Sequence, residues 1–111
     1  MSLVKEQSKF LLDVAELIQY ADSIGIVLTG GELFRTKEQQ SIYVNTGKSK
    51  TFHSNHLRRL AIDFNFFIDG VLTYEKDKIQ KLGDFWECLD KKNRWGGNWD
   101  FVDTPHFERN V

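Results

Sequence analysis

The stretch from residue 60 to residue 70 constrains the fold of this chain more than any other. Residues 60–68 are apolar at every position except Asp63 and Asn65, which indicates a buried strand. Asp69-Gly70 follows at once, and this dipeptide is a strong signal for a two-residue hairpin turn. A carboxylate inside such a strand is costly to bury unless a partner or a metal ion neutralises it. Asp63 therefore needs a structural or functional explanation.

Apolar residues recur at helical spacing in other parts of the chain. The stripe over residues 10–21 predicts an amphipathic helix that ends before Gly25. Thr36 followed three residues later by Gln39 resembles a capping box, which predicts that a second helix begins there. A third helical stripe consists of Ile79, Leu82, Trp86 and Leu89.

Short β segments and turns lie between these helices. Residues 24–28 end shortly before Gly30-Gly31, which predicts a strand followed by a tight turn. Residues 45–55 are polar and have no period, so they predict a loop, whereas Trp95-Gly96-Gly97 opens a last β segment that ends near Phe107. This order predicts an α+β fold in which helices cover one side of a small, mostly antiparallel sheet.

Length and composition limit the possible classes of protein. The 111 residues fit one domain, so we expect a single domain over residues 1–111. A formal net charge of -1 argues against nucleic-acid binding, and the residues near the start lack the features of a secretory signal. No apolar run is long enough to cross a bilayer, so we expect a cytoplasmic protein without membrane insertion. Cys88 is the only cysteine, which excludes multi-thiolate zinc sites.

A bound metal would therefore need histidine and carboxylate ligands. His56 and Asp63 lie close together in the sequence, and His106 lies in the last β segment. Catalytic zinc usually has three protein ligands of these types and keeps its fourth position for water. Two histidines and one aspartate match that count, although scattered residues of these types are common and do not identify a site by themselves.

Three ordered motifs are more specific than the residue types. Residues 54–64 read SNHLRRLAIDF, and residues 95–108 contain WGGNW followed by DTPHFE. Upstream, FRTKEQQ begins at Phe34 and is followed by Tyr43 and Gly47. Together they resemble the zinc peptidases that act on bacterial wall peptides. That family includes D-Ala-D-Ala carboxypeptidases and dipeptidases and the L-alanyl-D-glutamate endopeptidases of phage endolysins, and it implies a fold of the Hedgehog and D-Ala-D-Ala-peptidase type.

The resemblance implies roles for the residues that match its motifs. The zinc ligands would be His56, Asp63 and His106. Asp103 would be the catalytic acid/base, because a carboxylate three residues before the last ligand can reach the reacting water without binding the metal. Arg35 matches the arginine that steadies the substrate carbonyl and the developing oxyanion.

Further residues are expected to contact the substrate. Ser54 matches a serine two places before the first ligand and would either support that ligand or contact the peptide. Trp95 and Trp99 are expected in the core, in the wall of the cleft, or in both. Arg59 stands where many members of the family have glycine, so it could change the wall of the pocket.

Several residues also have ordinary structural interpretations. Asp63 could pair with Arg58 or Arg59, and Arg35 could balance Glu32. Glu108 is the nearest competitor of Asp103 as the catalytic base. His106 could be an edge-strand histidine that faces water. We expect His53 at the rim of the pocket or in solvent, and Cys88 as a small buried apolar residue.

Three functions remain in competition. The first is a phage-type endopeptidase that cleaves the L-Ala-D-Glu bond of peptidoglycan stem peptides. The second is a carboxypeptidase that acts on a terminal D-Ala-D-Ala bond, and the third is an inactive structural or wall-binding module. We expect a monomer that stays cytoplasmic until release and whose partner is the peptidoglycan peptide. Because the first two functions share all the motif residues, spacing does not distinguish them.

Overall fold

The computed structural model describes residues 2–31, 33–47 and 54–111. Its elements, with η for short 3₁₀ helices, are α1 (Leu3–Ser23), β1 (Ile26–Gly30), α2 (Lys37–Asn45), η1 (Asn55–Arg58), β2 (Ala61–Ile68), β3 (Val71–Thr73), α3 (Lys76–Leu89), β4 (Asn93–Trp95), η2 (Gly96–Asn98) and β5 (His106–Arg109). The predicted α+β class is confirmed. None of the helices in this part of the chain is long and apolar enough to span a bilayer.

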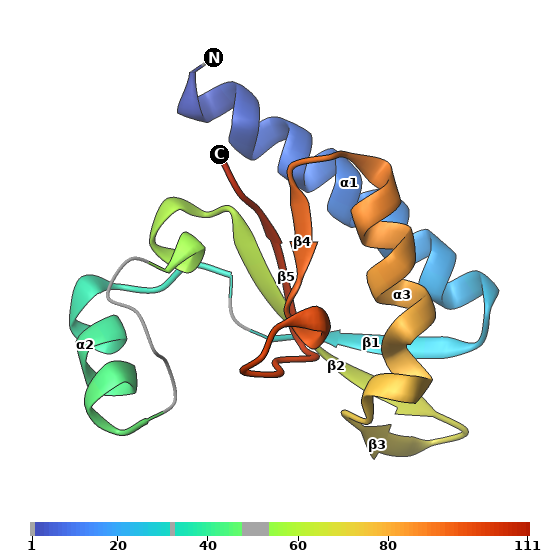
Figure 1. The fold of residues 1–111 in the computed structure, drawn as a ribbon. Coiled ribbons are helices and arrows are strands. Elements are labelled where there is room, and N and C mark those ends of the chain that lie inside the picture. Colours follow the sequence, from blue (N-terminus) through green and yellow to red (C-terminus); the bar gives the residue numbers. More distant parts are fainter. Residues whose placement is uncertain (1, 32, 48–53) are drawn as a thin grey trace.

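The strands form one sheet in the order β1-β2-β5-β4, and β3 pairs with β2 beyond the end of β5 (Figure 1). Every strand pair among the described residues is antiparallel. The predicted hairpin joins β2 to β3. Asp69 and Gly70 have φ angles of 52° and 77°, as the two central residues of a type I′ turn require.

Helices α1 and α3 lie next to each other against the sheet, whereas α2 lies apart from them (Figure 1). The core between helices and sheet is built from the predicted apolar stripes of α1 and α3 and from alternate residues of β2 and β5. Its fully buried members include Phe10, Leu17, Phe66, Ile79, Leu82, Trp86 and Phe107. The alternation leaves the other face of β2 and β5 for polar side chains.

Local signals explain where α1 and α2 begin. The Thr36 hydroxyl accepts a hydrogen bond from the backbone N–H of Gln39 at 3.0 Å, as predicted for the start of α2. Ser2 caps α1 in the same way through the N–H of Lys5. The predicted loop over residues 45–55 is bounded by the end of α2 and the start of η1, and residues 48–53 lie outside the described part of the chain.

Three expectations are corrected by the structure. The last β segment does not begin at Trp95: β4 ends there, Gly96 and Gly97 turn into η2, and β5 begins at His106. A Cβ atom on Gly97 would lie 2.2 Å from the Trp95 ring, so this segment turns where only glycine fits. Gly31 makes a close approach rather than a tight turn, since its Cβ would lie 2.7 Å from the carbonyl oxygen of Asp63. Cys88 is exposed, because it lies on the side of α3 that faces away from the core.

Candidate active site

His56 is held in place by contacts on both sides of its ring. It lies on η1, where the Ser54 hydroxyl accepts a hydrogen bond from its backbone N–H at 3.2 Å. Its Nδ1 lies 2.9 Å from the carbonyl oxygen of Leu33. Because a carbonyl can only accept, Nδ1 carries the proton of that bond, and Nε2 is the atom that faces Asp63.

Asp63 and His106 face each other across two neighbouring strands. They are direct partners in the register of β2 and β5, so their side chains leave the same face of the sheet. The neighbouring Phe64 points to the opposite face and belongs to the core. The backbone N–H of Gly31 donates to the carbonyl oxygen of Asp63 at 2.8 Å, which ties the end of β1 to this position.

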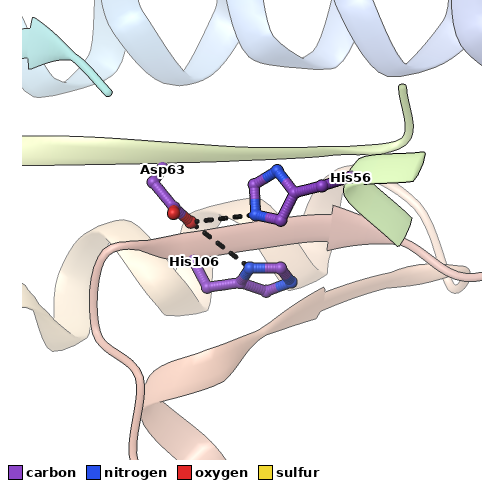
Figure 2. Close-up of side chains that lie close together, drawn as sticks. All are labelled: His56, Asp63 and His106. Carbon is purple, nitrogen blue, oxygen red and sulfur yellow. Dashed lines mark ion pairs between the residues drawn. The ribbon is translucent and has the colours of Figure 1, made fainter. Parts of the chain in front are cut away.

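The side chains of His56, Asp63 and His106 converge, as Figure 2 shows. Asp63 Oδ1 lies 3.3 Å from His56 Nε2 and 3.3 Å from His106 Nδ1, and the three ligand atoms lie within 4.8 Å of one another. Ligands bound tetrahedrally to zinc at about 2.0–2.2 Å are separated by roughly 3.3–3.6 Å. The two shortest separations therefore suit a zinc ion between these atoms.

Two of these atoms lack the partners that buried polar atoms normally have. Among the described residues, His56 Nε2 and Asp63 Oδ1 are buried without a well-formed hydrogen bond, and their nearest polar contacts are the ion-pair distances of 3.3 Å given above. Such atoms are rare in folded proteins and call for an explanation, since leaving them unpaired is unfavourable. A cation among the three side chains would satisfy both, so the donor set fits zinc. Asp63 has no ion pair with Arg58 or Arg59 among the described contacts.

Glu108 supports His106 rather than lining the cavity. Its carboxylate accepts the Nε2 hydrogen of His106 at 2.7 Å and also pairs with Arg94. This leaves His106 Nδ1 to face Asp63. A carboxylate behind a metal-binding imidazole orients the ring and increases its basicity. The position of Glu108 favours this supporting role over that of the catalytic base.

Glu108→Gln is expected to weaken zinc binding by about 10–100-fold. The glutamine can still accept a hydrogen bond from His106, but it lacks the charge that strengthens the imidazole as a ligand. The affinity is measured by competition with a chromophoric chelator. Glu38→Gln, an exposed change in the first turn of α2, is the matched control. Equal affinities in the two variants would contradict the supporting role of Glu108.

A cavity of about 390 Å³ opens beside Asp63. Its lining residues are Gly31, Arg35, Tyr43, Asp63, Phe64, Asn65, Tyr74, Asp103 and Pro105. Asp103 is held by its backbone, since its N–H donates to Gly96 at 2.9 Å and its carbonyl accepts from His106 at 3.1 Å. Burial and the nearby charge of Asp63 raise the pKa of Asp103 above its ordinary value. A raised pKa suits a group that must exchange a proton near neutral pH.

Arg35 is buried at the same cavity and is held by its own neighbours. Its guanidinium donates to the side-chain oxygen of Gln40 at 2.5 Å, lies 4.6 Å from the centre of the Tyr43 ring, and lies 3.4 Å from the Ser54 hydroxyl. These contacts hold the positively charged guanidinium of Arg35 at the cavity that Asp103 also lines. Its alternative partner Glu32 lies outside the described residues.

Two further residues that were predicted to contact the substrate, Trp99 and Arg59, lie in different environments. Trp99 is half-buried and its ring centre lies 5.0 Å from that of His106, so it is close to the three converging side chains. Arg59 is exposed and stacks on Phe34, with its guanidinium carbon 4.4 Å from the ring centre. Its φ of 57° is left-handed, which explains physically why glycine suits this position. His53 lies outside the described residues.

Trp95 belongs to the core and not to the wall of the cleft. It is fully buried, its indole N–H donates to the carbonyl oxygen of Thr104 at 2.9 Å, and its ring stacks on Phe107. A Cβ atom on Gly83 would lie 2.1 Å from this ring, so α3 packs directly against it. A substrate therefore has no access to Trp95, and the substrate contact expected from the sequence is wrong.

Sequence reasoning did not single out Asn65 and Tyr74, although both line the cavity. The signal for Asn65 was present, because residues two apart on a strand share a face and Asp63 was already a candidate ligand. No comparable signal marked Tyr74, which reaches the cavity through the hairpin between β2 and β3.

Three comparisons with known proteins each give a related match. Residues 47–109 match the peptidase M15 family described as D-alanyl-D-alanine carboxypeptidase. The chain is 37% identical over 99 residues to an L-alanyl-D-glutamate peptidase of Listeria phage A118. This alignment covers 86% of this chain but only 34% of the phage protein. It also resembles the L-Ala D-Glu endopeptidase ChiX of Serratia marcescens, with a TM-score of 0.70 and 26% identity over 88% of this chain and 78% of the other.

The three matches agree with the motifs and with the convergence of His56, Asp63 and His106. The chain spans about a third of the length of the phage relative. The family match covers more than half of the chain, from the end of α2 through the three candidate ligands to the last strand. This protein is therefore a member of peptidase family M15.

Proposed function

We propose that the protein is a zinc-dependent endopeptidase that hydrolyses the L-alanyl-D-glutamate bond of peptidoglycan stem peptides. The observation that carries the proposal is the cavity beside Asp63. A carboxylate with a raised pKa and a buried arginine line the same cavity as a candidate metal ligand. The phage and Serratia relatives are named for peptidases of this bond, which favours it as the substrate.

His56 Nε2, Asp63 Oδ1 and His106 Nδ1 would hold the zinc. When bound, zinc would act as a Lewis acid and lower the pKa of a water molecule in its fourth position. Asp103 takes a proton from the attacking water and returns it to the leaving amine. Arg35 stabilises the negative charge that develops on the carbonyl oxygen, since its neighbours already orient the guanidinium.

Other residues shape and support this site. Ser54 caps η1 and lies beside Arg35, so it supports both a ligand and the oxyanion contact. Trp99 and Arg59 provide surfaces at the edge of the site for the rest of the peptide. The protein is expected to act as a monomer on the cell wall, to remain in the cytoplasm until release, and to have no nucleic-acid partner.

Zinc binding is expected to release about one proton at pH 7. Although burial opposes protonation of His106, its contacts with the Asp63 and Glu108 carboxylates raise its pKa to about 9. The metal-free protein therefore keeps His106 protonated at neutral pH, and zinc must displace the Nδ1 proton. Apparent affinity should rise roughly tenfold per pH unit from pH 6.5 towards 9 and then level off. Calorimetry in buffers of different ionisation enthalpy measures the number of protons released when zinc binds. Release of no proton at pH 7 would contradict a protonated His106 in the metal-free protein.

The same linkage predicts the stability of the metal-free protein. A histidine whose folded-state pKa is raised stabilises the fold below its unfolded value of about 6.5, and this contribution is lost as the pH rises through the folded value. The metal-free protein should therefore become less stable between about pH 6.5 and pH 9. Saturating zinc should cancel this loss, because its affinity increases by the same factor over the same range, so the stability of the zinc-loaded protein should stay nearly constant between about pH 6.5 and pH 9.

The family description favours a second candidate, a carboxypeptidase that removes terminal D-alanine. Digestion of purified muropeptides, with the products identified by mass, distinguishes the two. Cleavage between L-alanine and D-glutamate supports the endopeptidase, whereas release of free D-alanine supports the carboxypeptidase. Chelator-treated and zinc-restored samples test the metal in the same assay. A zinc-loaded protein that cuts neither bond would support the third function, an inactive wall-binding module.

A further inference from the structure

We propose that Asn65, oriented by Tyr74, forms a substrate subsite that binds a hydrogen-bond acceptor oxygen of the peptide. The inference rests on the proposed function, because it names a substrate contact in the same cavity. Neither the motifs nor the comparisons assign a role to these two residues.

The first observation is the place of Asn65 on β2. It lies two residues after Asp63, so both side chains leave the same face of the strand, and both line the cavity. Two residues of a strand extend about 6.6 Å. An extended peptide covers the same length with about two residues. Asn65 is therefore within reach of groups one or two residues from the cleaved bond.

The second observation is that Tyr74 orients the amide of Asn65. The Tyr74 hydroxyl donates to Asn65 Oδ1 at 2.6 Å. The backbone of Tyr74 is itself held, because the Thr104 hydroxyl donates to its carbonyl oxygen at 2.8 Å, and its ring meets Phe66 edge to face. Thr104 directly follows Asp103. The orientation of the amide is thus linked to the segment that holds the proposed acid/base.

The third observation concerns the Nδ2 group of the Asn65 side-chain amide. Among the described residues, only the Tyr74 hydroxyl hydrogen-bonds the Asn65 side chain. Because its oxygen is used, Asn65 has two N–H bonds of Nδ2 left to offer in the cavity. The group that they recognise must therefore be an acceptor, either a carbonyl or a carboxylate. A purely aliphatic group offers no acceptor for these two N–H donors.

An L-Ala-D-Glu substrate has acceptors of both kinds near the cleaved bond. The D-glutamate residue carries a free α-carboxylate one carbon from the scissile nitrogen, and peptide carbonyls lie on either side. Arg35 lines the same cavity and would favour a carboxylate there. Both sources share the chemistry of an acceptor oxygen, and the experiment distinguishes them.

The test compares Asn65→Asp and Asn65→Leu with wild type on two peptides. One peptide has the α-carboxylate on D-glutamate, and the other has an α-carboxamide in its place. Asn65→Asp keeps the oxygen that Tyr74 binds but replaces the N–H donors by an acceptor, whereas Asn65→Leu removes both without adding charge. Asn110→Asp, an exposed change beyond the last strand, controls for the added charge. Zinc content is measured for each variant.

Both Asn65 variants are expected to raise KM by about 10–100-fold on the carboxylate peptide, with a smaller change in kcat and unchanged zinc content. If the acceptor is the α-carboxylate, Asn65→Asp should raise KM much less on the carboxamide peptide, because the carboxamide can donate a hydrogen bond to Asp. If the acceptor is a peptide carbonyl, KM should rise by the same factor on both peptides. Tyr74→Phe should have a smaller effect in the same direction.

A KM within twofold of wild type for both Asn65 variants on both peptides would overturn the subsite. Failure of the proposed function appears differently, as a wild-type protein that leaves the peptide uncut. The subsite is then still tested by the equilibrium Kd of the zinc-loaded proteins for the same two peptides. A Kd that does not change between wild type and the Asn65 variants would overturn it in that case.

Discussion

Replacing Asp103 by asparagine is expected to lower kcat by about 10²–10⁴-fold while zinc remains bound. Asparagine has nearly the same shape, so the backbone contacts of this position with Gly96 and His106 can persist. It cannot accept or return a proton, which is the role that we assign to the carboxylate. Zinc content by metal analysis and kcat on a stem peptide are the two measurements.

Asp100→Asn is the matched control, because Asp100 is an exposed carboxylate in the same loop. It should keep both zinc and activity. If Asp103→Asn retained activity within tenfold of wild type, the carboxylate would not be the acid/base. Glu108→Gln would then be re-examined for loss of kcat in addition to loss of metal.

His106→Ala is expected to remove zinc binding and the stability that zinc contributes. Zinc that binds only the folded state stabilises it by about 2.7 kcal/mol when its concentration is 100 times its Kd. For a domain of this size, that corresponds to a rise in Tm of about 10 °C or more. The variant lacks one of the three ligands, so its Tm should not respond to zinc.

The metal-free wild type provides the control for this variant, because removing a buried imidazole also leaves a cavity. The difference in Tm between the two proteins in chelator measures the loss of packing together with the loss of the contacts of His106 with Asp63 and Glu108. The loss of metal is the additional difference that appears when zinc is restored. An equal zinc-dependent rise in both proteins would exclude His106 as a ligand.

Much of the architecture follows from local patterns in the chain. The stripes of α1 and α3, the cap at Thr36 and the Asp69-Gly70 hairpin each depend on residues near one another in sequence, and the structure confirms them. The three ordered motifs likewise identified the family, because each keeps a short, regular spacing. The convergence of the candidate ligands was inferred from that resemblance and not from the spacing of the residues.

Local patterns were less informative where long-range packing decides the environment of a side chain. Trp95 was open to two interpretations, and only the approach of Gly83 on α3 places it in the core. Cys88 lies next to a buried stripe, yet the rotation of α3 against the sheet leaves it exposed. The glycines at positions 31, 96 and 97 signalled irregular backbone, but their neighbours in space determine its form.

The candidate site depends most on such long-range contacts. The amino-acid sequence alone determined the three helices, the β2–β3 hairpin and the residues with ligand chemistry, because these depend on periodicity and on residue type. The pairing of β2 with β5 puts Asp63 opposite His106, and the contacts with Leu33 and Glu108 decide which nitrogen of each imidazole faces Asp63. These depend on hydrogen bonds between segments far apart in the chain, which local periodicity does not encode.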